Sequence, residues 1–196
     1  MPSPVGHTLG AYAALVTLDP RWVQDRKRNL VALGLAFTFG TMADADFIVA
    51  EYSNNPALHH HFFTHSIPFA VGLMLVTILL LKLFRVRRPL WYGFMLGVAY
   101  GTHLLLDYFA QDGSTPVGIP LLWPFTIRHF ITPVNIFYSI HRGEFTDLFS
   151  FHNFVAILIE ILILLPIALL AHWYAKRRLS KQAVTHFSAR KDEIAS

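Results

Sequence analysis

Residues 90–110 read LWYGFMLGVAYGTHLLLDYFA, and this stretch decides the fold class. It approaches the ~20 predominantly apolar residues that a membrane-spanning helix needs. Further apolar runs lie at 67–84, at 154–175 and, shorter, at 29–43. A marginal run at 5–18 would reach only ~21 Å at 1.5 Å per residue. The sequence therefore predicts an all-α membrane protein, a bundle of four to five transmembrane helices.

The overall composition agrees with a membrane protein. Of the 196 residues, 54% are hydrophobic and 14% are charged, whereas soluble proteins have about 25% charged residues. This apolar content excludes a disordered chain, and the absence of cysteine excludes a disulfide-stapled module. The net charge of +4 does not indicate a nucleic-acid partner, because the basic residues lie between apolar runs and not on one soluble face.

The basic residues predict the orientation of the chain. Fourteen of the sixteen lysines and arginines fall within 21–28, 82–88 and 176–191. The positive-inside rule places these segments in the cytoplasm, so the connections 44–66 and 111–153 lie outside. The C-terminus is then cytoplasmic, and the N-terminus is outside if the run at 5–18 also crosses.

This map divides the chain into one membrane-embedded helical domain over residues 1–175 and a basic cytoplasmic tail over 176–196. Residues 111–153 contain several prolines and aromatic side chains. Prolines prevent a continuous span, and aromatic residues favour the headgroup region. We expect this stretch to form a re-entrant or interfacial segment on the outer side.

Ionisable side chains gather toward the predicted outer end. His103 and Asp107 are four residues apart within the run at 90–110, so they lie one above the other on one helix face and can share a cation. Ionisable residues inside a span are costly and point to a functional site. The spacing therefore favours a metal-binding role over an incidental hydrogen bond.

Two other motifs offer metal ligands at the same end of the predicted bundle. Asp44 and Asp46 follow the run at 29–43, where they bind metal, act as a general base, or simply cap the helix end. Residues 59–61 are three consecutive histidines, and a fourth follows at position 65. Histidine-rich tracts are typical of metal sites, and within this tract His60, His61 and His65 are the candidates.

Four further residues have accessory roles in this interpretation. Asp112 is a candidate general base or a solvated loop residue. Glu160 lies in the last apolar run and either completes the cluster or pairs with His103. Arg128 and Arg142, the two basic residues on the outer side, either hold an anionic group such as a phosphate or are ordinary surface arginines.

Several of these motifs, in this order, resemble the YdjM family. They are Gly6-His7, Asp44-Ala45-Asp46, the segment 60–66 that ends in Phe-Thr-His-Ser, His103-Leu-Leu-Leu-Asp107, and 118–125 (GIPLLWPF). The likeness extends from the N-terminus to about residue 125. The chain departs from the usual pattern at two places. Ala43 and Phe47 flank the aspartate pair in place of Pro and His, and His61-Phe62 replaces Arg-Gly.

The resemblance implies a metal-dependent hydrolase of the bacterial inner membrane, in a family also described as LexA-binding. The family is in turn similar to helical phospholipases C and P1-type nucleases, which hold a zinc cluster on helices. By that likeness the ligands are His7, Asp44 or Asp46, His65, His103 and Asp107, holding one to three ions. Imidazole and carboxylate donors suit zinc, and also manganese or iron.

The expected chemistry is metal-assisted hydrolysis near the outer face of the membrane. An ester or phosphoester of a lipid or a lipid-linked headgroup is the expected substrate. The rival interpretation is a non-enzymatic metal-binding membrane protein, either a divalent-cation permease or a regulatory scaffold. A permease needs polar residues through both leaflets, and the runs that contain His103 and Glu160 have no charge below these residues.

Overall fold

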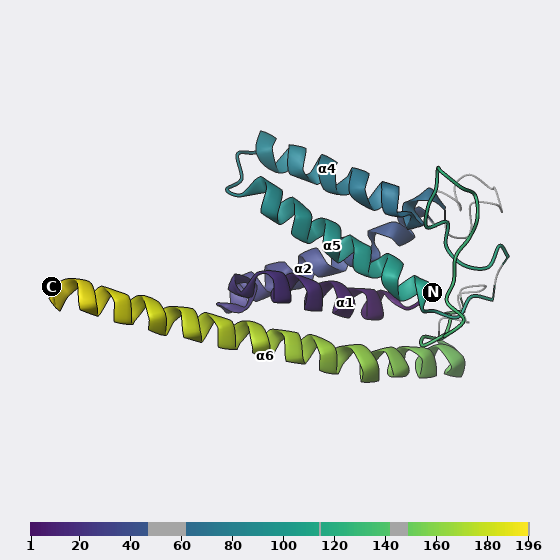
Figure 1. The fold of residues 1–196 in the computed structure, drawn as a ribbon. Helices are drawn as coiled ribbons and strands as arrows, with labels where there is room; N and C mark the ends of the chain where they lie inside the picture. The colour runs from purple at the N-terminus through teal and green to yellow at the C-terminus, as the bar shows by residue number, and fades with distance from the viewer. Residues whose placement is uncertain (47–61, 114, 142–148, 196) are drawn as a thin grey trace.

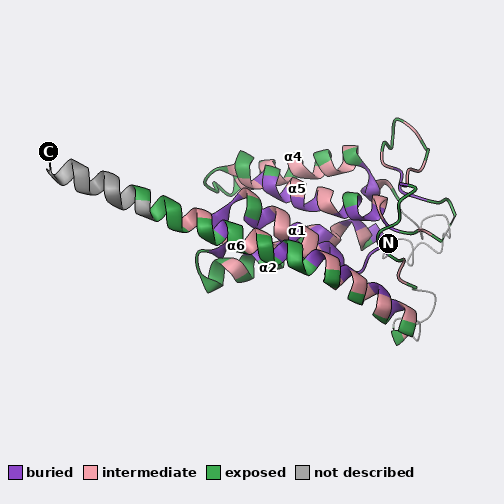
Figure 2. Cartoon of the chain, turned by 60° about the horizontal axis from the view of Figure 1, so that its bottom comes forward, coloured by how far each residue is buried: buried purple, intermediate pink, exposed green. Residues whose placement is uncertain are grey.

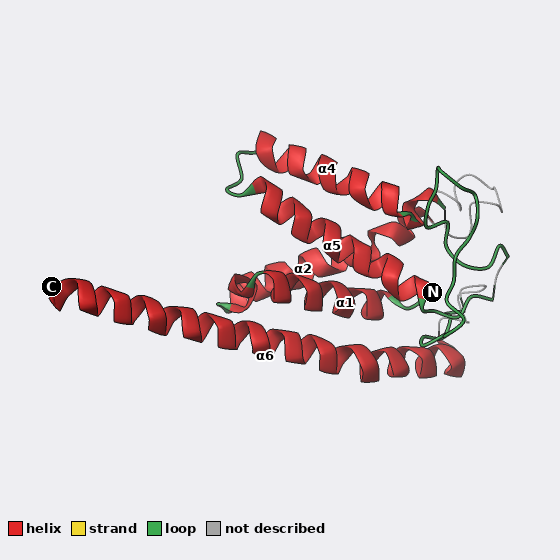
Figure 3. Cartoon of the chain, viewed as in Figure 1, coloured by secondary structure: helices red, strands yellow, loops and turns green. Residues whose placement is uncertain are grey.

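The computed structural model of the chain describes residues 1–46, 62–113, 115–141 and 149–195, with the backbone alone for 184 and 186–195. Across these ranges the regular secondary structure is helical, and there is no strand (Figure 3). The α-helices are α1 (Pro4–Leu18), α2 (Arg26–Thr41), α4 (Ile67–Leu83), α5 (Pro89–Tyr108) and α6 (Phe151–Ala195). Short 3-10 turns are η1 (Pro20–Val23), η2 (Met42–Ala45) and η4 (Phe63–His65). The predicted all-α class is confirmed.

The helices alternate in direction, so that several of their ends meet at one end of the molecule (Figure 1). The start of α1, the end of α2, the start of α4, the end of α5 and the start of α6 all lie there, together with the described part of the loop that follows α5. Helix α6 runs beside α1 and continues well beyond the other helices toward the C-terminus. This arrangement brings short segments from distant parts of the chain together.

Side-chain caps fix where three of these helices begin. The Ser3 hydroxyl accepts a hydrogen bond from the Gly6 N–H, and the Ser66 hydroxyl accepts one from the Phe69 N–H. The Asp25 carboxylate does the same for the Arg28 N–H. Such caps satisfy N–H groups that the first helical turn leaves without partners. The caps at Ser3 and Ser66 thus define the register of the helices at the end where the loops gather.

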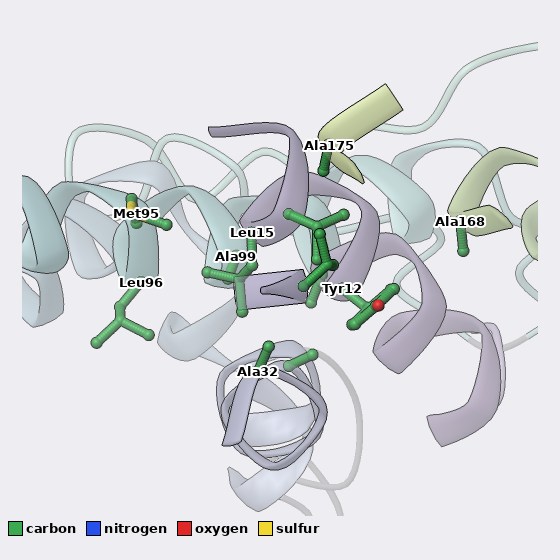
Figure 4. Close-up of a cluster of buried hydrophobic side chains, with 12 residues drawn as sticks. Tyr12, Leu15, Ala32, Met95, Leu96, Ala99, Ala168 and Ala175 are labelled. Carbon is green, nitrogen blue, oxygen red and sulfur yellow. The ribbon is translucent and has the colours of Figure 1, made fainter. Parts of the chain in front are cut away.

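Small side chains let α1, α2 and α5 approach each other closely. Ala11, Ala32, Ala36 and Ala99 are fully buried, and they pack around Leu15. Figure 4 shows several of these side chains converging between the helices, with Ala168 and Ala175 of α6 nearby. Small residues at a helix interface allow close backbone approach, as is common between membrane helices.

The number of membrane spans is not confirmed by the structure. In the described ranges, only the part of α6 over Phe151–Ala183 is long and apolar enough to cross a bilayer, and α4 is an apolar but shorter helix. The predicted helices are therefore confirmed. That four or five of them cross the membrane stays a prediction. The fifteen residues of α1 illustrate the reason, since they extend only ~22 Å.

The loop after α5 and the segment after residue 175 were both predicted to lie outside the membrane-spanning helices, and the structure gives them different backbone conformations. Residues 111–113 and 115–141 form an irregular loop whose backbone pairs with itself at Ile119 and Phe130. Its Phe125 and Ile127 side chains are about 85% exposed. Helix α6 passes residue 175 without interruption (Figure 2). The tail predicted from residue 176 thus begins as a continuation of a helix, and its cytoplasmic location stays a prediction.

Candidate metal centre

A cluster of histidine and aspartate side chains lies where the helix ends meet. His7 comes from α1, Asp44 and Asp46 from η2 and the residue after it, His65 from η4, and His103 and Asp107 from α5. The three histidines are fully buried, and Asp107 is 4% exposed. Separate segments of the chain therefore deliver their ionisable groups to one buried place.

His103 is oriented by a backbone carbonyl at the end of α2. Its Nδ1 lies 2.7 Å from the Gly40 oxygen, which can only accept, so Nδ1 carries the proton. Nε2 lies 3.0 Å from Asp107 Oδ2 on the same helix face, where it can bind a cation or, when protonated, donate to that oxygen. The predicted proximity of these two residues is confirmed.

His65 is held by Asp46 on the side away from the cluster. Asp46 Oδ2 lies 3.1 Å from His65 Nδ1 and accepts hydrogen bonds from the Phe62 N–H and the Thr64 hydroxyl. Burial alone would raise the pKa of Asp46, but these donors hold it below its usual value. The proton therefore lies on His65 Nδ1, and Nε2 faces His103 Nε2 at 3.2 Å. A carboxylate behind a histidine is the usual support of a metal ligand.

His7 completes the buried side of the cluster. Its ring stacks on the His103 ring, with centroids 3.7 Å apart and planes 15° from parallel. Its Nε2 lies 3.6 Å from Asp107 Oδ1, and neither ring nitrogen has a hydrogen-bond partner among the described residues. A buried polar atom without a partner is costly and needs an explanation, such as a bound ion.

The spacing of the donor atoms fits a tetrahedral ion. Ligands about 2.0–2.2 Å from zinc at tetrahedral angles lie about 3.3–3.6 Å from each other. Three distances within the cluster fall close to that value. His103 Nε2 is 3.2 Å from His65 Nε2 and 3.0 Å from Asp107 Oδ2, and His65 Nε2 is 3.4 Å from the same Asp107 oxygen. Asp44 Oδ1 lies 4.0 Å from His103 Nε2.

The donors form two overlapping sets. One is His7, His103 and Asp107, the other is Asp44, His65 and His103, and in each set the donor atoms lie within 4.8 Å of one another. Both sets contain His103, whose Nδ1 is already engaged by Gly40. His103 therefore has one nitrogen to offer, and only one ion can use it.

The other candidate residues lie in other environments. Asp112 Oδ2 accepts a hydrogen bond from the Gly118 N–H in the loop after α5, and Arg128 is exposed in the same loop. Glu160 is fully buried and accepts a hydrogen bond from the Ser3 N–H. This contact differs from both predicted alternatives, which were completion of the cluster and pairing with His103. His60, His61 and Arg142 lie outside the described residues.

Sequence reasoning missed the groups that orient the histidines. The Gly40 carbonyl is a backbone group and leaves no residue-type signal. Thr64 lies beside His65 in the motif Phe-Thr-His-Ser, and this adjacency could have indicated it. Tyr100 donates its hydroxyl to the Thr64 carbonyl at 2.6 Å and so ties η4 to α5. Tyr100 lies on the same face of α5 as His103, one turn earlier, and this position could have indicated that it contacts the cluster.

The fold and the cluster define a class of protein, namely a helical protein with a buried group of histidines and aspartates that could hold a metal ion. The chain belongs to the YdjM inner membrane protein family, whose family model matches residues 1–179. This confirms the resemblance seen in the sequence and associates the chain with the lipid bilayer of the inner membrane. Comparisons with curated proteins and with solved structures gave no match.

Proposed function

We propose that this protein is a metal-dependent hydrolase of the inner membrane. The observation that carries the proposal is the spacing of His65, His103 and Asp107, whose donor atoms lie 3.0–3.4 Å apart in a buried cluster. Two imidazoles and carboxylates are a donor set typical of catalytic zinc. Manganese or iron would accept the same donors.

Each residue of the cluster has a distinct part in the proposed reaction. His65, His103 and Asp107 would hold the ion that uses His103, with Asp44 beside it, and His7 with the second oxygen of Asp107 would contribute to a neighbouring ion. The metal would supply Lewis acidity, which makes water nucleophilic at neutral pH. Asp44 is the most exposed side chain of the set, at 15%. It therefore lies nearest to solvent, and we assign it the acceptance of the proton from the attacking water.

We also propose that α1, α2, α4 and α5 lie within the bilayer, with the cluster toward its outer face. None of the residues of α4 is buried, and Leu75, Leu79 and Leu83 are more than half exposed. Such a continuous apolar surface favours a lipid environment. A site at the outer interface favours an ester or phosphoester of a lipid or lipid-linked headgroup as the substrate.

Metal analysis of the purified protein tests the proposal most directly. We expect wild-type protein in detergent to carry stoichiometric zinc, manganese or iron, and Asp107→Ala to lose it. Asp25→Asn is the matched control, because Asp25 is an exposed helix cap far from the cluster in sequence and asparagine caps about as well. Metal-free wild-type protein of normal stability would contradict the proposal.

Turnover separates the hydrolase from a metal-binding scaffold or permease. We expect the metal-loaded protein to hydrolyse a chromogenic phosphodiester or a short-chain ester. Asp44→Asn should lower the rate by 10²-fold or more while keeping most of the metal. Bound metal without turnover on either probe, or on phospholipid vesicles, would favour the non-enzymatic alternative.

A further inference from the structure

Glu160 is a carboxylate inside the long apolar stretch of α6. Its side chain is fully buried, and a buried charge requires strong partners. Both of its oxygens bind one residue at the opposite end of the sequence. The Ser3 N–H donates to Oε1 at 2.8 Å, and the Ser3 hydroxyl donates to Oε2. Glu160 therefore attaches α6 to the start of α1.

Ser3 transmits this attachment to the first turn of α1. The Ser3 hydroxyl caps the helix by accepting from the Gly6 N–H at 3.3 Å, and the Ser3 carbonyl accepts from the His7 N–H at 3.1 Å. All the polar groups of Ser3 are thus used, two toward Glu160 and two toward the helix. The backbone position of His7 depends directly on this residue.

The close fit continues at Gly6. A Cβ atom at this position would lie 2.6 Å from Glu160 Oε2, so only glycine lets the carboxylate reach the helix end. The His7 ring has no hydrogen bond to hold it among the described residues. Its place in the cluster is therefore set by the backbone of α1 and by stacking on His103.

The other histidines are held in a different way. His103 is oriented by the Gly40 carbonyl, and His65 by Asp46. Neither of these contacts involves α6. Loss of the contact between Glu160 and Ser3 would therefore displace His7 selectively.

We propose that Glu160 is a positioning residue that sets His7 against Asp107 by fixing Ser3. This inference rests on the proposed metal site, because its consequence is measured as metal binding. Glu160 is not a ligand in this proposal. It acts across the interface of α1 and α6, and removing it should have the same effect as removing His7.

A double-mutant cycle with Zn²⁺ as the probe tests the inference. The proteins are wild type, His7→Ala, Glu160→Leu and the double variant, each titrated in detergent against a chelating dye. We expect each single variant to bind the ion 10–100-fold more weakly, as is typical when a ligand or its support is lost. The double variant should be no weaker than His7→Ala, because coupled residues are not additive.

Two further variants separate positioning from general packing. Glu160→Gln keeps groups able to bind the Ser3 N–H and hydroxyl, and it should recover most of the affinity. Leu164→Ala is the matched control, because Leu164 also contacts the Gly6 position from α6. It should lower the melting temperature without changing Zn²⁺ affinity. Should Glu160→Leu not fold, Ser3→Ala takes its place in the cycle.

The outcomes are distinguishable. Wild-type affinity in Glu160→Leu, or an additive loss in the double variant, overturns the positioning role and leaves the proposed function intact. An equal loss of affinity in Leu164→Ala also overturns it. Absence of Zn²⁺ binding by the wild-type protein overturns the proposed metal site, and the inference with it.

Discussion

The hydrogen bond on one nitrogen of an imidazole decides what the other nitrogen can do. The Gly40 carbonyl settles this for His103 and the Asp46 carboxylate settles it for His65, so both histidines turn Nε2 toward Asp107. Among the described residues, Asp46 contacts His65, Thr64 and the Phe62 N–H, and His65 links it to the other donors. It was predicted as a ligand or a catalytic residue, and its contacts support an orienting role.

Replacing the charge behind His65 should weaken metal binding without removing the site. Asp46→Asn keeps the size of the side chain and loses the negative charge that makes His65 a better donor. We expect Zn²⁺ affinity to fall 10–100-fold, measured by competition with a chelating dye, while zinc still binds at saturating concentration. Unchanged affinity would mean that Asp46 does not support His65.

For single residues, the sequence predicted the candidate metal ligands better than the groups that orient them. The four-residue spacing of His103 and Asp107 follows from helix geometry alone. The resemblance, and not the spacing, implied His7, because a single histidine near the N-terminus carries no pattern. The role of Gly40 could not be predicted, since every residue has a carbonyl oxygen and only the fold selects one of them.

At the scale of the elements, the closeness of α1 and α2 depends on Gly40. A Cβ atom there would lie 2.8 Å from the His7 carbonyl oxygen and 3.0 Å from Ala11 Cβ. We expect Gly40→Ala to separate the helices, to cost about 1–3 kcal/mol, and to lower metal content. Thermal unfolding in detergent and metal analysis measure the two effects.

Gly34 provides the matched control in the same helix. A Cβ atom at Gly34 would have no atom within 4 Å of it among the described residues. Gly34→Ala should therefore be neutral or should stabilise α2 by up to ~1 kcal/mol through helix propensity, with full metal content. Equal losses in both variants would show that the close approach at Gly40 is not the cause.

The corner between α1 and η1 should make stability depend on pH. Asp19 is buried, which alone would raise its pKa, but hydrogen bonds from the Arg21 side chain and N–H hold the pKa below the usual value. The resulting stabilisation is complete above the unfolded pKa of ~3.9 and is lost as pH falls through the lower folded value.

Asp19→Asn measures this contribution. Arg21 is 39% exposed, so we expect a loss on the order of 1 kcal/mol at pH 7. The difference in melting temperature from wild type should shrink below about pH 4, and metal content at pH 7 should not change. A difference that is constant over this pH range would exclude an electrostatic origin.

At the scale of the whole molecule, the apolar runs predicted where the helices lie but not how many of them cross the membrane. The runs at 5–18, 29–43, 67–84 and 90–110 all became helices with ends close to those predicted. Their crossing could not be settled because hydropathy measures preference for lipid, while a span also requires length. The loop after α5 was predicted as interfacial, and its exposed Phe125 and Ile127 are compatible with that.

Single cysteines test the orientation, since the chain has no native cysteine. We expect Gly113→Cys in the loop to react with an impermeant thiol reagent added to intact cells, and Lys181→Cys to react only after lysis. Both positions are exposed, so burial does not explain a difference. Labelling of position 181 but not of position 113 in intact cells would show that the orientation is the opposite of the predicted one.

The order in which the donors occur along the chain has a consequence for assembly. His7 leaves the ribosome first, and His103 and Asp107 come from α5, close to one hundred residues later. A nascent chain that has not yet delivered α5 lacks the residue shared by both donor sets. At the proposed metal site, the complete donor set would therefore exist once α5 has been synthesised, so metal loading would follow the insertion of the earlier helices and would not guide it.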